Sequence, residues 1–105
     1  MTMLQRQGGR VVVRLPEEVD HHHTEEIRRQ VDRIVREEPV TEVEFDFSET
    51  AFMDSAGIGM LIGRHQIMRA VGGRVTVSHM RSQIRRILEL SGIQKYISLG
   101  EEESK

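Results

Sequence analysis

Apolar and polar side chains alternate along two stretches of the chain, and this period of two predicts β-strands. The first stretch covers residues 10–15, and Pro16 ends it because proline cannot donate a hydrogen bond to a ladder. The second stretch covers residues 42–47, where three acidic residues occupy one face. Because carboxylates are costly to bury, we expect that face of the sheet to be in contact with water.

Shorter alternating segments predict two further strands. Residues 74–78 (RVTVS) place valines on one side and hydroxyls on the other. Residues 3–7 predict an edge strand, with Gly8 and Gly9 forming a hairpin turn into the next strand. Residues 97–99 predict a last short strand.

Apolar residues at helical spacing predict a first helix over residues 24–37, with Glu25 and Glu26 in its first turn, preceded by a loop over residues 17–23. Pro39 ends this helix.

A second helix is predicted over residues 55–71, with Ile67 and Val71 facing inward, Arg64 facing outward, and Gly72 ending it.

A third helix is predicted over residues 82–91, capped by Ser82 and ended by Gly92. Strands that alternate with helices imply parallel pairing and right-handed crossovers. The sequence therefore predicts an α/β fold of two layers, a mixed and mostly parallel sheet with helices packed on one face.

Composition limits the classes of function. A chain of 105 residues suits one domain, and a hydrophobic fraction of 37% with a charged fraction of 30% is typical of a globular protein. The net charge of -2 gives no reason to expect nucleic acid or an anionic membrane as a partner. Residues 1–6 do not resemble a secretory signal, and no apolar run is long enough to span a membrane. We expect a cytoplasmic protein.

The candidate chemistry lies in residues 52–59 (FMDSAGIG), where a predicted strand leads into the second helix. A helix start has free backbone N–H groups and the positive end of the helix dipole, so a phosphate on Ser55 would be tolerated there. Small residues after Ser55 leave the first turn accessible to a partner. Two simpler interpretations stay open: Ser55 is itself the N-cap, or Asp54 either caps the helix or orients the serine hydroxyl.

Other constellations are weaker. A small hydrolase using Ser55 is disfavoured because residues 53–57 (MDSAG) lack the first glycine of a nucleophile elbow. Three adjacent histidines, residues 21–23, point in different directions, and we expect no metal there.

Three glycines at residues 57, 59 and 63 do not match a dinucleotide fingerprint, and Gly59 and Gly63 share a helix face open to docking. A set of arginines at residues 81, 85 and 86 is expected to be a solvated basic face.

Residues 52–59 resemble the phosphorylation loop of the anti-sigma factor antagonists, which are STAS-domain proteins. Residues 15–22 (LPEEVDHH) resemble the segment before the first helix of that family, and residues 71–75 (VGGRV) and 87–93 (ILELSGI) resemble its later elements. The resemblance extends over about residues 10 to 97. The Asp-His-His segment at its expected distance points to the sporulation branch, the anti-sigma F factor antagonists.

The resemblance implies a single STAS domain over residues 1–100, with a charged tail over residues 101–105. It implies a monomeric, non-enzymatic binding module without a cofactor. The unphosphorylated form would bind an anti-sigma factor that is also an ATP-dependent serine kinase, and would thereby release the sigma factor. Phosphorylation of Ser55 would end the interaction, and a serine phosphatase would restore it. The residues that the resemblance implies for partner binding are Glu18, Asp20, Asp54, Ser55, Ala56, Gly57, Ile58 and Gly59. The alternative is a STAS regulatory subunit of another signalling or transport complex, against which the Asp-His-His segment argues.

Overall fold

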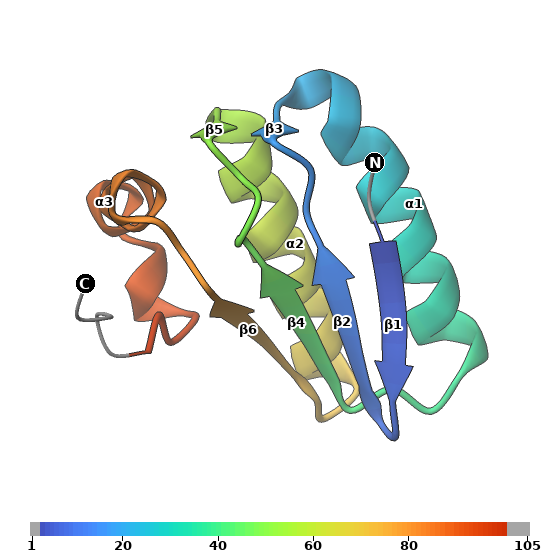
Figure 1. Cartoon of the computed structure of the whole chain (residues 1–105). Coiled ribbons are helices and arrows are strands. Elements are labelled where there is room, and N and C mark those ends of the chain that lie inside the picture. The colour runs from blue at the N-terminus through green and yellow to red at the C-terminus, as the bar shows by residue number, and fades with distance from the viewer. Residues whose placement is uncertain (1–2, 101–105) are drawn as a thin grey trace.

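The computed structural model describes residues 3–100, which form a mixed β-sheet and the helices around it (Figure 1). The sheet has four strands in the order β1-β2-β4-β6. Strand β1 is antiparallel to β2, and the remaining neighbours are parallel. A two-stranded parallel ladder joins β3 and β5. The elements are β1 (Met3–Gln7), β2 (Arg10–Arg14), β3 (Glu18–Val19), α1 (His21–Glu37), β4 (Glu42–Asp46), β5 (Phe52–Met53), α2 (Ser55–Ala70), β6 (Arg74–Ser78), α3 (Ser82–Ser91) and the 3-10 turn η1 (Ile93–Lys95).

The alternation of the sequence explains the layers. Val13, Phe45 and Val77 lie side by side across β2, β4 and β6, and all three are buried. Helices α1 and α2 pack against this apolar face, while α3 lies beyond the β6 edge (Figure 1). The predicted architecture, a mixed and mostly parallel sheet with helices on one face, is confirmed.

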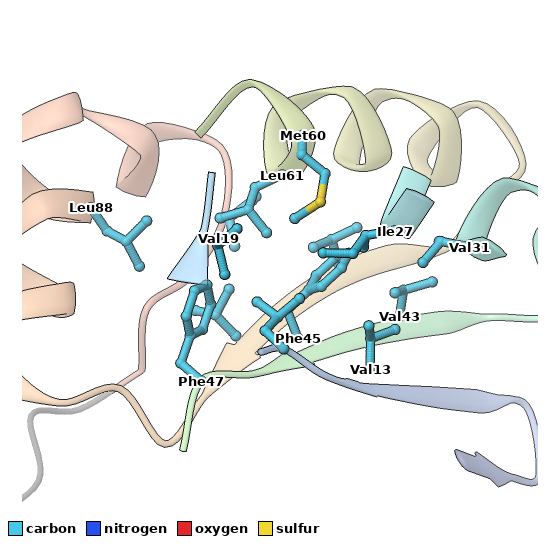
Figure 2. Packing of buried hydrophobic residues seen from close by; sticks show 14 of the residues in the cluster. Val13, Val19, Ile27, Val31, Val43, Phe45, Phe47, Met60, Leu61 and Leu88 are labelled. Carbon is cyan, nitrogen blue, oxygen red and sulfur yellow. The ribbon is translucent and has the colours of Figure 1, made fainter. Parts of the chain in front are cut away.

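The core lies between the sheet and its helices (Figure 2). Phe45 and Phe47 extend from β4 and the residue after it toward the helices, and neither is accessible to solvent. Ile27 from α1 and Leu61 from α2 cover them, and Leu88 extends the cluster to α3. Burying each of these side chains contributes about 1.5–3 kcal/mol, so this cluster fixes how the helices sit on the sheet.

The opposite face of the sheet carries the acidic residues of β4, and they are less accessible to water than predicted. Asp46 is 6% exposed, and Glu44 is half-buried. Glu44 accepts hydrogen bonds from Arg10 Nη1 at 2.9 Å and from Ser78 Oγ at 2.6 Å. The expected contact of this face with water is therefore only partial, because arginines and hydroxyls on neighbouring strands cover much of the carboxylates.

Helix α2 also departs from its predicted faces. Arg64, expected outside, is only 8% exposed, and its Nε lies 2.9 Å from Asp32 Oδ1 on α1. Burial lowers the pKa of the Arg64 guanidinium, and the Asp32 carboxylate opposes this effect. Ile67 and Val71, expected inside, are 37% and 64% exposed. The long arginine side chain instead bridges α1 and α2.

The segment before α1 contains more regular secondary structure than predicted. Residues 17–23 were expected to form a loop, but they include strand β3 and the first turn of α1. The helix begins at His21, so Glu25 and Glu26 lie after its first turn. Strands β3 and β5 have two residues each, too few for an alternation pattern to predict.

The C-terminal part confirms α3 and corrects its flanks. Helix α3 covers the predicted residues and ends at Gly92, whose φ of 81° suits glycine. Ser82 is the first helical residue rather than the cap, and residues 97–99 form no strand. Arg85 donates to the carbonyls of Leu99 and Gly100, so it is not part of a solvated basic face.

The predicted tail, residues 101–105, lies outside the described residues. None of the helices within residues 3–100 is long and apolar enough to cross a membrane.

Candidate functional site

A short parallel ladder brings the N-termini of α1 and α2 together. Val19 of β3 pairs with Met53 of β5, and both side chains are buried. The backbone N–H of Asp54 donates to the carbonyl of Val19 at 3.2 Å. Directly after the ladder each strand leads through one aspartate into a helix, so two helix starts lie at the same end of the fold (Figure 1).

Asp54 is the N-cap of α2. Its Oδ1 accepts a hydrogen bond from the backbone N–H of Ala56 at 2.9 Å. Ser55 follows as the first residue of the helix and is exposed. The interpretation of Ser55 as the N-cap was therefore wrong. Two roles were left open for Asp54, and in the structure it caps the helix. The serine hydroxyl therefore does not cap the helix, although serine is a common N-cap residue.

Asp20 caps α1 in the same way. Its Oδ1 accepts from the backbone N–H groups of His22 at 3.1 Å and His23 at 3.2 Å. The ring Nδ1 of His23 lies 2.7 Å from the same oxygen. Hydrogen bonding from the His23 side chain lowers the pKa of the Asp20 carboxyl, which keeps the cap ionised.

His21 links the two helix starts. Its Nδ1 lies 3.9 Å from Asp54 Oδ2, the oxygen that does not cap α2. Its side chain is 70% exposed, and its ring contacts that of His22 in a tilted arrangement, with centroids 4.0 Å apart. The two capping aspartates and the three histidines, residues 21–23, therefore form one cluster of ionisable groups beside Ser55.

The glycines of α2 have different surroundings. Gly57 is buried, and a Cβ there would lie 2.5 Å from Cγ of Met53 and 3.1 Å from Cγ1 of Val19. It permits close packing of the helix on the ladder rather than leaving the first turn uncovered. Gly59 is exposed, and a Cβ there would meet no atom within 4 Å. Ser55 and Gly59, four residues apart, are thus both exposed on one face of α2.

The remaining predicted residues gather at the same end of the fold. Glu18 is exposed on β3, opposite Phe52 in the ladder. Ala56 and Ile58 are half-buried in the first turns of α2. Sequence reasoning did not select Phe52, an aromatic side chain that is 51% exposed.

The closeness of His21 and Asp54 was not predicted either. A repeated pattern could have indicated it, since an apolar residue and an aspartate precede the helix at both residues 19–20 and 53–54. Within residues 3–100, no group of three or more His, Cys, Asp or Glu residues is arranged to hold a metal ion.

Comparison with known proteins identifies the family. The family model described as the STAS domain matches residues 1–105, and the chain belongs to the STAS domain family.

Similar proteins indicate the branch of the family. The chain is 32% identical to an anti-sigma F factor antagonist of Lysinibacillus sphaericus, over 89% of this chain and 80% of that protein. The structure is similar to that of the anti-sigma factor antagonist SpoIIAA in its unphosphorylated form, with a TM-score of 0.85, 30% identity, and coverage of 97% and 90% of the two chains. It is also similar to the Bacillus cell fate determinant SpoIIAA in the phosphorylated form, with a TM-score of 0.76, 30% identity, and coverage of 97% and 93%. These matches confirm the predicted resemblance to the sporulation anti-sigma factor antagonists.

Proposed function

We propose that the chain is an anti-sigma factor antagonist that works as a phosphorylation switch without catalysing a reaction itself. Its unphosphorylated form binds an anti-sigma factor that is also an ATP-dependent serine kinase, and this binding releases the sigma factor. Phosphorylation of Ser55 ends the interaction, and a serine phosphatase restores it. One of the similar structures is of a phosphorylated form, which supports the proposal.

The observation that carries the proposal is the division of roles between two adjacent residues. Asp54 provides the N-cap, so the exposed Ser55 hydroxyl is not needed to hold the helix. The first turn of α2 nevertheless presents the positive end of the helix dipole to a phosphate. Ser55 can therefore gain and lose a phosphate while the helix stays intact.

The binding surface in this proposal consists of Glu18, Asp20, Asp54, Ser55, Ala56, Gly57, Ile58 and Gly59. Its exposed members contact the anti-sigma factor, and buried Gly57 sets the position of the helix start. A phosphate adds a charge of about -1.5 to -2 to this surface. The added charge blocks docking by collision with an anionic group of the partner, without remodelling the fold.

Binding of the purified anti-sigma factor, measured by calorimetry, tests the proposal. We expect binding by the parent chain and loss of binding after phosphorylation. Ser55→Asp should lose only part of the affinity, because a carboxylate carries less charge and fewer acceptor oxygens than a phosphate. Ser48→Ala, in an exposed turn, is the control and should bind normally. Equal affinity of the phosphorylated and unphosphorylated chains would refute the switch.

The docking face can be tested separately. Gly59→Leu adds bulk at an open position, and leucine is a better helix former than glycine. We expect a folded protein that no longer binds the anti-sigma factor. Retained affinity would place the docking face elsewhere.

A further inference from the structure

One histidine of the cluster, His21, lies beside the proposed phosphorylation site. Helices α1 and α2 begin at equivalent points past the β3–β5 ladder, with His21 as the first residue of one and Ser55 as the first residue of the other. The His21 ring lies 3.9 Å from a carboxylate oxygen of Asp54, the residue directly before Ser55. An imidazole thus already lies near the start of α2.

The other two histidines have different contacts. The His23 ring lies 2.7 Å from Asp20, on the cap of its own helix. The His22 ring lies against the His21 ring in a tilted arrangement. The other ionisable residues that flank the two helix starts in the sequence are Glu17, Glu18, Asp20 and Asp54.

We propose that His21 is the charge partner of phosphorylated Ser55, and that it makes the phosphorylated state dependent on pH. This inference rests on the proposed phosphorylation of Ser55. The second ionisation of a phosphoserine occurs near pH 6, and an unperturbed imidazole titrates near pH 6.5. When two groups that titrate in the same range lie close together, the charge of each shifts the pKa of the other, and they titrate as a coupled pair.

The sign of the coupling follows from the charges. The proton on His21 favours the doubly ionised phosphate, so the phosphate completes its ionisation at a lower pH when His21 is present. A protonated imidazole also offsets part of the added negative charge, whereas a neutral imidazole does not. Phosphorylation therefore blocks the anti-sigma factor more strongly at pH 8 than at pH 6.

The test needs phosphoserine at position 55 without dependence on any kinase. We would incorporate phosphoserine at that codon during translation of the full chain, and follow its ³¹P NMR signal between about pH 5 and pH 8. His21→Gln removes the proposed partner from an exposed position. His23→Gln is the matched control, since it removes the same kind of ring two residues away, where the ring lies against Asp20.

We expect the midpoint of the phosphate titration to rise by about half a unit in His21→Gln, and by much less in His23→Gln. An unchanged midpoint in His21→Gln would overturn the inference, and so would equal shifts in both variants. Because the phosphoserine is installed directly, failure of a kinase to modify Ser55 would contradict the proposed function and leave this titration interpretable.

Discussion

Asp54 caps helix α2 by accepting a hydrogen bond from the backbone N–H of Ala56, with a donor–acceptor distance of 2.9 Å. The residue between them, Ser55, is exposed and does not provide the cap. This arrangement separates the residue that stabilises the helix from the residue that we propose is modified. It lets the stability of the fold and its regulation be tested with different substitutions.

The capping role of Asp54 is the first prediction. Asp54→Ala removes the acceptor for the Ala56 N–H, and should lower the free energy of unfolding by about 1 kcal/mol. Asp54→Asn keeps an oxygen acceptor at the same position and should be close to the parent chain. Urea denaturation followed by circular dichroism gives both values. Equal losses in the two variants would mean that charge, rather than capping, is the contribution of Asp54.

The surroundings of two glycines on α2 predict opposite effects of the same change. Gly57→Ala places a methyl group against Met53 and Val19, and should destabilise the fold by about 1–3 kcal/mol. Gly59→Ala meets open space, so the helix propensity of alanine should stabilise the fold by about 0.8–1 kcal/mol. Thermal melting of both variants is the measurement. A stabilising Gly57→Ala would show that the helix start is not tightly packed on the ladder.

The ion pair between α1 and α2 predicts an asymmetry. Asp32→Ala leaves the buried Arg64 guanidinium without its counter-charge, and should cost about 2–3 kcal/mol. Arg64→Met replaces the buried cation with an apolar chain of similar length and leaves Asp32 partly exposed to water, so it should cost less. Chemical denaturation of both variants decides the order. A larger loss in Arg64→Met would contradict this account.

The pKa of Asp20 predicts how the α1 cap responds to acid. Because hydrogen bonding from His23 lowers this pKa, the stabilisation is fully present above the ordinary value of 3.8 and is lost as the pH falls through the lower, folded-state value. His23→Gln should move the titration midpoint of Asp20 upward. The ¹³C NMR shift of the Asp20 carboxyl group, followed in both proteins, measures it. An unchanged midpoint would show that the His23 ring is not the cause.

The sequence predicted the strands and helices in which apolar and polar side chains repeat with a clear period. Strand β4 alternates over five residues, and α3 has a complete apolar stripe closed by Gly92, so both were placed within a residue of their observed bounds. Arg64 could not be placed correctly, because a charged residue is expected outside unless its partner is known. Its partner, Asp32, lies on another helix.

The candidate site was predicted in outline and not in detail. A serine at a helix start was evident from residues 52–59, whereas its cap and its neighbours depend on the β3–β5 ladder. Two-residue strands carry no periodic signal, so the closeness of His21 to Asp54 is a property of the fold that local sequence does not express.

The central claim is that Ser55 is the phosphoacceptor of the switch, and intact mass spectrometry tests it most directly. The chain would be incubated with ATP and the anti-sigma factor that has serine kinase activity, alongside Ser55→Ala and the control Ser48→Ala. The account predicts the mass gain of one phosphoryl group in the parent chain and in Ser48→Ala, and no gain in Ser55→Ala. A mass gain that persists in Ser55→Ala would contradict it.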